Sequence, residues 1–530
     1  MRFKKFSLPI ILILVAINSC LAFTAQGSDE KPAFEISDLS YDNTKQVFSL
    51  IDDAGSMHTV LGVSYPSWVY CKSMKDQTCN PLTAKSGEGG IIGESVVAYC
   101  MSNTQENCVE KIEISRDGKS YSTLEFEKYI PDGIYENHIA EDPQYNLPAG
   151  GAPAVFVEKI NGIVQEKKYL VIFDYNTNFD PTIQKFSVVA IRLAIKPFKE
   201  INSEQWNSLW FGEGHSGISY DFDPGVTMRA TVHMTNTVNG WFKGRLKSPI
   251  VSISKLTDKN NRVVIAGEPV QVPNFAYVKA KNEVTNDESQ WLSKGGLQKG
   301  VLILEPSNKE AFNYIDFFRD RVKDQIIATT SQWNFISTNW ESDNPCLHDS
   351  SQMLGIVNTN SMVYLGNVPE FKDGFLNYKV AGMHFQTDGI TPVTGTYDLL
   401  IRSDAARCLY GFSNAPVYAS ISIAGASGVQ EIATTVVNES DGWMHLSAKG
   451  FTFSDKTIKI KLSQGQSTVS ATPSAAPSAT STPIPVATPS ATPIKTSQKT
   501  PNKTIYCIKG KILKKIVGIN PKCPSGYLKK

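Results

Sequence analysis

The chain has 530 residues, of which 41% are hydrophobic, and its net charge is +1. Setting aside the ten lysines of residues 495–530 and the three basic residues at the N-terminus leaves residues 28–494 with a net charge of −12. This acidic body argues against nucleic acid as a partner, because nucleic-acid-binding proteins carry a basic face. The length allows about two or three domains of ordinary size.

The first 27 residues have the pattern of a signal peptide. Three basic residues precede an uncharged apolar run, 8–17, which is too short to span a membrane because ten helical residues rise only about 15 Å. Cleavage is expected after Ala22 or after Gly27. The sequence Ile17-Asn-Ser-Cys20 also resembles a bacterial lipobox, so a lipid on Cys20 is an alternative. We therefore predict a protein that is secreted or held at the cell surface.

The body has the composition of a globular β protein. Short runs of Val, Ile, Thr, Phe and Tyr alternate with Gly, Asn and Asp, which favours antiparallel hairpins over βαβ units. We expect an N-terminal β-rich domain (28–235), a middle α+β segment (236–350) and a C-terminal β domain (351–464). The predicted fold class is mainly β, with two or more antiparallel sandwich-like or barrel-like domains and a few helices.

Two cysteine pairs repeat in a similar context. Tyr70-Cys71-Lys-Ser73 precedes Cys79, and Tyr99-Cys100-Met-Ser102 precedes Cys108. Eight cysteines follow the signal peptide, and an even number in an exported chain favours disulfides over metal or redox chemistry. We predict local disulfides, Cys71–Cys79 and Cys100–Cys108, with crossed pairing as the alternative, and Cys346–Cys408 by remainder. Neither the cysteine gaps nor the seven histidines have metal-site spacing, so no metal and no cofactor are expected.

Asp174, Asn176, Asn178 and Asp180 alternate as oxygen donors, as at the start of a calcium loop. The sixth position is Phe179 instead of Gly and the twelfth is Lys185 instead of Glu. This favours a turn after a strand that ends at residue 173.

Two further segments could carry a site. Trp206, Trp210 and Phe211 could stack on sugar rings, or could close a short helix onto a sheet. Gly214-His-Ser216-Gly217 resembles the nucleophile elbow of serine hydrolases, but Ile218 replaces the last glycine and no helix is expected to follow. We predict that Ser216 is not a nucleophile, and we assign no catalytic residue.

The clearest strand is 226–234, in which apolar and polar residues alternate strictly. This pattern predicts one buried face and one face in water. Further β-type runs are 169–173, 186–195, 263–265, 396–401, 417–423, 432–437 and 458–462.

One helix is expected over residues 307–326. Ser307 and Glu310 have the spacing of a capping box. An apolar stripe then recurs with helical spacing and predicts packing on a sheet; it comprises Ala311, Ile315, Phe318, Val322 and Ile326.

The C-terminal part changes character at about residue 465. Residues 465–503 repeat Ala, Thr, Ser and Pro and predict a disordered linker, biased to extended polyproline II. Residues 504–530 predict a compact basic module closed by a Cys507–Cys523 disulfide. We expect this tail to bind an anionic cell-wall polymer or a membrane surface through its lysines, namely Lys509, Lys511, Lys514, Lys515, Lys522, Lys529 and Lys530.

Several motifs occur together: Gly240-Trp-Phe-Lys-Gly-Arg245, Asp373-Gly-Phe-Leu-Asn-Tyr378, Asp441-Gly-Trp443, and the tail motifs Cys507-Ile-Lys-Gly-Lys511 and Pro521-Lys-Cys-Pro-Ser-Gly-Tyr527. They resemble a family of uncharacterised exported actinobacterial proteins with a Pro/Thr linker and a basic two-cysteine C-terminal tail. The resemblance implies export and a shared architecture, and it implies no activity.

The sequence favours a non-catalytic exported protein with a binding, adhesion or envelope role, whose body takes a glycan or a protein ligand. The alternative is a secreted hydrolase that acts on polysaccharide or peptide. An enzyme would bring acids, bases or a nucleophile into one cleft, whereas a binding module would present a polar or aromatic face without them.

Overall fold

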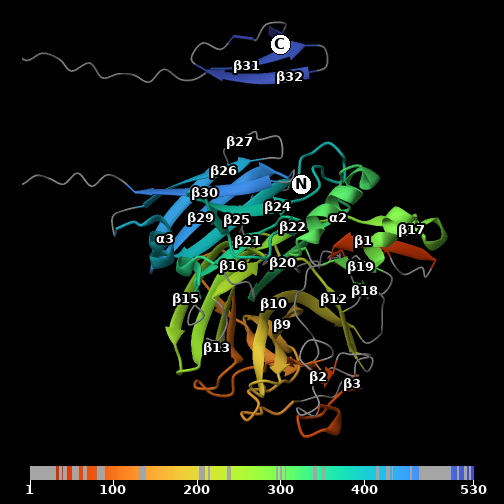
Figure 1. Cartoon of the computed structure of the whole chain (residues 1–530), viewed down its shortest axis with the longest axis vertical. Coiled ribbons are helices and arrows are strands. Elements are labelled where there is room, and N and C mark those ends of the chain that lie inside the picture. The colour runs from red at the N-terminus through yellow and green to blue at the C-terminus, as the bar shows by residue number, and fades with distance from the viewer. Residues whose placement is uncertain are drawn as a thin grey trace, which may run out of the picture. The chain divides into compact units, whose positions relative to one another are not determined.

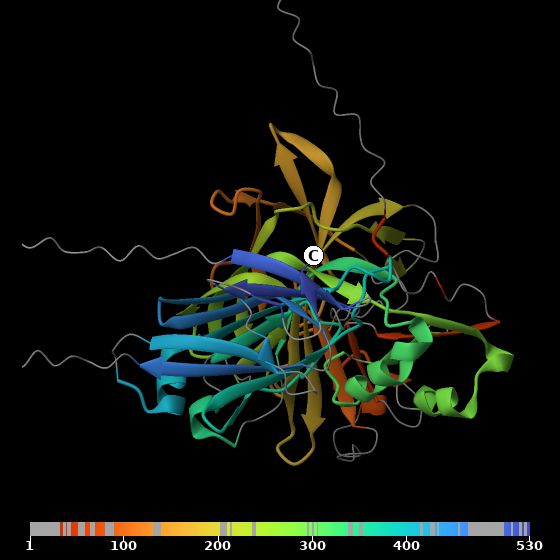
Figure 2. The same ribbon diagram turned by 90° about the horizontal axis from the view of Figure 1, so that it is seen from above.

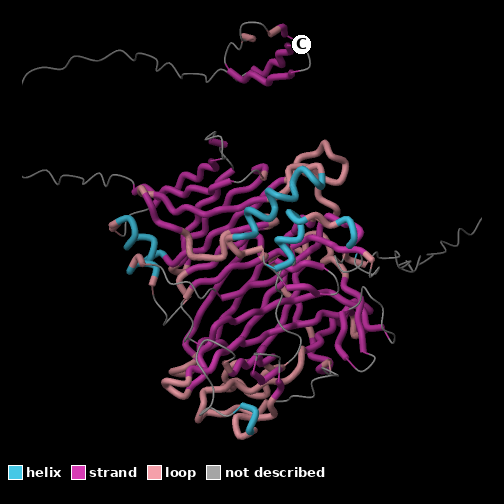
Figure 3. Tube along the Cα trace, turned by 45° about the vertical axis from the view of Figure 1, so that its right-hand side comes forward, coloured by secondary structure: helices cyan, strands magenta, loops and turns pink. Residues whose placement is uncertain are grey.

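The computed structural model describes residues 32–34, 39, 44–50, 59–63, 69–79, 90–130, 139–201, 209–212, 215–235, 240–293, 296–298, 301–304, 306–337, 343–348, 353–413, 417–424, 430–431, 434–453, 456–464, 503–509, 512–518, 522–523 and 527–529. The predicted signal peptide (1–27) and linker residues 465–502 lie outside these ranges. The described residues form two compact units, divided between Ser467 and Thr468. The fold is mainly β, as predicted, and helices are few (Figure 3).

An antiparallel barrel forms the centre of the first unit (Figure 1). The long hairpin β9–β10 continues on one side through β8 and β7 and on the other side through β20, β16 and β13. β13 then pairs with β5, and β5 pairs with β6, which leads directly into β7 and closes the ring. The barrel strands are β5 (Cys108–Ser115), β6 (Ser122–Thr123), β7 (Glu125–Tyr129), β8 (Ala154–Ile160), β9 (Ile163–Asp180), β10 (Lys185–Ile201), β13 (Thr227–Thr235), β16 (Asn260–Asn274) and β20 (Ala328–Ser337).

A second sheet leaves the barrel at β20. β14 pairs with β20 and, in parallel, with β21, and the sheet continues through β25, β29 and β28. β15 pairs with β16 beside the barrel. These strands are β14 (Trp241–Gly244), β15 (Leu246–Lys255), β21 (Gly355–Thr359), β25 (Thr394–Arg402), β28 (Thr434–Ser440) and β29 (Trp443–Thr452).

The first hydrophobic core lies inside the barrel. A third sheet and two helices, α2 and α3, enclose a second core against the second sheet. Buried side chains of the second sheet, the third sheet, α2 and α3 form one apolar cluster. Figure 2 shows α1 and α2 on one side of this unit and α3 on the other. The elements are β22 (Val363–Tyr364), β23 (Glu370–Lys372), β24 (Phe375–Ala381), β26 (Val417–Ala424), β27 (Gln430–Glu431), β30 (Lys456–Gln464), α1 (Asn286–Ser289), α2 (Glu310–Arg319) and α3 (Ser403–Tyr410).

Smaller elements surround these layers. One sheet has the order β17-β1-β19-β18, β2 and β3 extend from β4, and β11 and β12 extend from β10. Their bounds are β1 (Lys45–Leu50), β2 (Val60–Val63), β3 (Val69–Tyr70), β4 (Ile91–Val96), β11 (Leu209–Gly212), β12 (His215–Ser219), β17 (Tyr277–Ala280), β18 (Gly296–Gln298) and β19 (Val301–Leu304). Short 3-10 turns are η2 (Gln77–Cys79), η3 (Lys281–Glu283), η4 (Gln290–Ser293), η5 (Asp320–Val322) and η6 (Pro345–Leu347).

Alternation of side chains fills the barrel with apolar residues. On β13, Met228, Ala230 and Val232 point inward and are fully buried, which confirms the predicted inner face. We expected the opposite face to lie in water, but this is only partly so, because Thr231 and His233 on that face are also buried. The chain around residues 100–110, which is distant in the sequence, covers His233: Cys100, Gln105 and Cys108 all contact its imidazole ring.

The body is not divided at the expected boundaries. β10 and β20 pair across residue 235, and β14 and β21 pair across residue 350. The segments on the two sides of each expected boundary therefore share sheets and belong to one compact unit.

The predicted helix is shorter than expected. Its N-cap residue is Lys309, and the Ser307 hydroxyl instead accepts a hydrogen bond from Lys243. The helix ends at Arg319, and the chain turns sharply where Lys323 and Asp324 adopt positive φ angles of 54° and 56°. The apolar stripe of the helix is nevertheless buried against the second core, as predicted.

Candidate functional site

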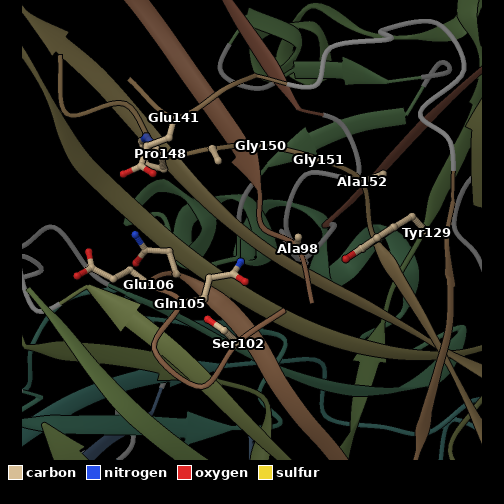
Figure 4. Close-up of a pocket in the computed structure, with 12 residues that line it drawn as sticks. Ala98, Ser102, Gln105, Glu106, Tyr129, Glu141, Pro148, Gly150, Gly151 and Ala152 are labelled. Atoms are coloured by element: carbon tan, nitrogen blue, oxygen red, sulfur yellow. The ribbon is translucent and has the colours of Figure 1, made fainter. Parts of the chain in front are cut away.

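A pocket of about 660 Å³ opens beside the barrel, between two loop segments of the first unit (Figure 4). One segment follows β4, and the other leads into β8. The described residues that line the pocket are Ala98, Ser102, Gln105, Glu106, Asn107, Tyr129, Glu141, Pro148, Ala149, Gly150, Gly151 and Ala152.

The Cys100–Cys108 disulfide closes the loop that forms one wall of the pocket. Two backbone hydrogen bonds fix the start of this loop to Val109 of β5, the strand in which the loop ends: Cys100 N donates to Val109 O (2.9 Å), and Val109 N donates to Ala98 O (3.0 Å). Asn107 adopts a φ of 52°, a conformation that asparagine tolerates better than most residues. The wall is thus tied covalently and by the backbone to the barrel.

Residues 139–152 form the other wall. Ile139 and Gly150 exchange backbone hydrogen bonds, and Gly151 N donates to Val96 O. The Thr59 hydroxyl donates to Gly151 O (2.7 Å) and accepts from Val96 N (3.0 Å). A Cβ atom on residue 150 would lie 2.4 Å from Cγ2 of Thr59 and 3.2 Å from Cα of Ser95 on β4, so the wall can lie this close to both only because residue 150 is glycine.

Tyr129 provides the aromatic surface of the pocket. Its ring contacts Phe126 at 4.9 Å between centroids, and Phe126 stacks on Tyr99 at 4.9 Å. The Tyr129 hydroxyl accepts a hydrogen bond from Tyr99 N (3.1 Å), yet 37% of the residue is exposed. Burial raises the pKa of Tyr129, so the phenol stays neutral at physiological pH and presents an uncharged ring.

Two carboxylates lie across the pocket from Tyr129 in Figure 4. One Glu106 oxygen accepts from the Thr257 hydroxyl (2.9 Å) and the other from the Asn260 amide (3.3 Å). Glu141 is exposed. No lysine, arginine or histidine is among the described lining residues. The pocket therefore favours ligands that donate hydrogen bonds and disfavours anions.

The predicted disulfides are present where the side chains are described. The structure joins Cys71 to Cys79, Cys100 to Cys108 and Cys346 to Cys408. Cys523 is also disulfide-bonded, but the side chain of its expected partner Cys507 lies outside the described residues.

The second unit contains a three-stranded sheet with the order β32-β31-β33. Its strands are β31 (Lys503–Lys509), β32 (Ile512–Gly518) and β33 (Leu528–Lys529). Of the predicted binding lysines, Lys522 is exposed. The side chains of the other six, Lys509, Lys511, Lys514, Lys515, Lys529 and Lys530, lie outside the described residues, as does Cys20.

The incomplete calcium motif is part of a strand. β9 continues to Asp180 because it pairs with β4 and β10 over this stretch, so the turn that we expected after residue 173 is wrong. Asp174 is fully buried and binds Arg192, and Asn176 donates to Glu94. Asp174 and Asn176, two of the four oxygen donors, therefore already bind other protein groups.

The other two candidate segments also lie in strands. Ser216 belongs to β12, which pairs with β10 and β11, so it does not lie in a strand-to-helix elbow. Trp210 and Phe211 belong to β11 and not to a helix. The side chains of these three residues, and all of Trp206, lie outside the described residues.

Sequence reasoning missed the pocket, although it did identify the disulfide loop in one wall. The run of small residues in Pro148-Ala-Gly-Gly-Ala-Pro153 was the available signal for the other wall, because such residues let backbones approach closely.

None of the described helices is long and apolar enough to cross a membrane. Comparison of the chain with protein-family models, curated proteins and solved structures found no significant match.

Proposed function

We propose that this chain is an exported, non-catalytic binding protein whose pocket takes an uncharged, hydroxyl-rich ligand such as a short stretch of polysaccharide. The observation that carries the proposal is the lining, in which hydroxyl, amide and carboxylate groups accompany one exposed tyrosine, without a described basic residue. The volume of about 660 Å³ lies within the roughly 300–1,000 Å³ of small-ligand sites.

Sugar hydroxyls match this lining chemically. They can donate to the oxygens of Gln105, Glu106 and Glu141 and accept from amide and hydroxyl groups. The exposed part of the Tyr129 ring can pack on the C–H face of a sugar. An anionic ligand would meet two carboxylates and no described cation.

Export and surface retention are part of the proposal. The signal pattern of residues 1–27 supports export, and so do the disulfides, which persist in oxidising compartments. The ten lysines of residues 495–530 support retention on an anionic wall polymer or membrane surface.

A secreted glycoside hydrolase is the second candidate, because Glu106 and Glu141 line one pocket. Most such enzymes use a pair of carboxyl groups that flank the glycosidic bond. Hydrolysis of the bound glycan, abolished by both Glu106→Gln and Glu141→Gln, would select this alternative.

The test is a glycan array probed with the full chain, followed by calorimetric titration of the best neutral oligosaccharide. Tyr129→Ala should weaken binding roughly fivefold, since it removes an aromatic contact worth about 1 kcal/mol. Tyr418→Ala is the matched control, because Tyr418 is an exposed tyrosine on β26.

Affinity for a neutral sugar should change little between low and high salt. Binding of amines alone, with strong salt dependence, would contradict the proposal. Equal effects of Tyr129→Ala and Tyr418→Ala would also contradict it.

A further inference from the structure

A buried histidine lies beneath the disulfide loop of the pocket wall. His233 on β13 is opposite Cys108 of β5 in the strand pairing, and it is only 1% exposed. Its Nδ1 atom lies 3.4 Å from Sγ of Cys108 and 3.7 Å from Sγ of Cys100. One imidazole nitrogen and two sulfur atoms therefore converge on one point.

The other ring nitrogen of His233 is held by a carboxylate. Nε2 lies 3.0 Å from Oε2 of Glu110, and Arg262 binds both oxygens of Glu110 at 2.5 and 2.7 Å. This bidentate contact with Arg262 holds the Glu110 carboxylate in place to accept a hydrogen bond from Nε2–H of His233. A metal-ligating histidine characteristically donates its second N–H to a carboxylate in this way.

The sulfur-to-nitrogen distances also suit a tetrahedral metal ion, which the two sulfur atoms can bind together only after their disulfide bond is broken. Zinc bonds of about 2.3 Å to sulfur and about 2.0–2.1 Å to nitrogen place these two ligand types about 3.5 Å apart. The observed sulfur-to-nitrogen distances of 3.4 and 3.7 Å fall on either side of this value. Nδ1 also lies 2.5 Å from the carbonyl oxygen of Gln105, within hydrogen-bond distance, and this contact must be given up when Nδ1 binds a metal ion.

We propose that, once the Cys100–Cys108 disulfide is reduced, Cys100, Cys108 and Nδ1 of His233 bind a thiophilic divalent metal ion such as Zn²⁺. A dithiol reductant supplies two electrons, so that the protein S–S bond breaks to give two thiols and the reductant becomes a disulfide. The ion then displaces one proton from each thiol and binds the two thiolates and the imidazole. This site is independent of the ligand proposed for the pocket.

The second cysteine pair of the repeat provides a matched comparison. Cys71 and Cys79 have the same separation of 8 residues and also form a disulfide. Among the described residues, the potential metal cluster contains Cys100, Cys108 and His233 and does not include Cys71 or Cys79. Metal binding should therefore depend on one pair and not on the other.

The test uses Co²⁺ as a spectroscopic substitute for Zn²⁺. The full chain is reduced with a water-soluble phosphine, which is oxidised to the phosphine oxide with oxygen from water, and is titrated with Co²⁺ without air. We expect about one equivalent to bind with a thiolate-to-cobalt charge-transfer band and the intense d–d absorption of a tetrahedral site.

The variants make the result specific. The spectrum should persist in Cys71→Ser/Cys79→Ser and disappear in Cys100→Ser/Cys108→Ser, while Glu110→Gln should weaken Co²⁺ binding by about 10–100-fold through the histidine. Circular dichroism confirms that each reduced variant is folded. If the reduced chain lacks the charge-transfer band, or if the band survives loss of Cys100 and Cys108, the proposal is overturned.

Discussion

Replacement of Arg192 by methionine tests how the barrel holds a buried charge. Asp174 on β9 faces Arg192 on β10, and the Asp174 side chain is 0% exposed while that of Arg192 is 10% exposed. Arg192 Nε contacts the two carboxylate oxygens at 3.2 and 2.9 Å, and Nη2 contacts one of them at 2.6 Å. Removing the guanidinium leaves a buried carboxylate, which costs about 3–5 kcal/mol of unfolding free energy.

Urea unfolding, followed by tryptophan fluorescence, measures this cost. The double variant Arg192→Met/Asp174→Leu should recover most of the loss, because it removes both charges together. Arg402→Met is the control, since it breaks an exposed pair with Asp404 and should cost at most about 1 kcal/mol. Equal costs for Arg192→Met and Arg402→Met would refute the reasoning.

Three further predictions follow from single features. Burial opposes ionisation of Glu288, but hydrogen bonds from Thr285 N and Lys279 lower its pKa to about 2. The ionised carboxylate should therefore stabilise the folded chain fully above about pH 4.5, and this contribution should be lost as the pH falls toward 2. In acid titrations, Glu288→Gln should remove about 1–2 kcal/mol of this pH-dependent stability. Replacing Cys346 and Cys408, which close a loop with a separation of 62 residues, should cost roughly 4 kcal/mol in urea unfolding, against under about 3 kcal/mol for Cys71 and Cys79. A reporter fused to residues 495–530 should stay with cell envelopes at low salt and wash off at 1 M salt, where the Debye length falls from about 10 Å to about 3 Å; retention that ignores salt would argue against a basic anchor.

Local pattern was sufficient for β13 and for the local disulfides. Strict alternation over residues 226–234 predicts β13, because side chains of a strand point alternately to two faces. The spacing of Cys71 and Cys79 predicts their disulfide, because a short polar loop brings the two Cα atoms within reach.

Long-range pairing could not be predicted in the same way. The parallel contact of β14 with β21 joins segments that the composition placed in different domains. The capping box expected from Ser307 and Glu310 does not form either, because Lys243 of β14 donates a hydrogen bond to the Ser307 hydroxyl. Tertiary contacts decided both outcomes.

The candidate site was hidden for the same physical reason. Its walls come from residues 98–107 and 139–152, which the barrel brings together although neither contains a known motif. His233 was assigned to the wet face of its strand, because nothing in residues 226–234 reveals that the chain around residues 100–110 covers it.

Hydrogen–deuterium exchange of the full chain, with and without a saturating neutral oligosaccharide, tests the pocket most directly. We predict slower exchange in peptides that cover residues 98–107 and 139–152, with exchange unchanged in β26, which contributes no residue to the lining. Protection elsewhere in the body, with residues 98–107 and 139–152 unchanged, would contradict the assignment of this pocket as the ligand site.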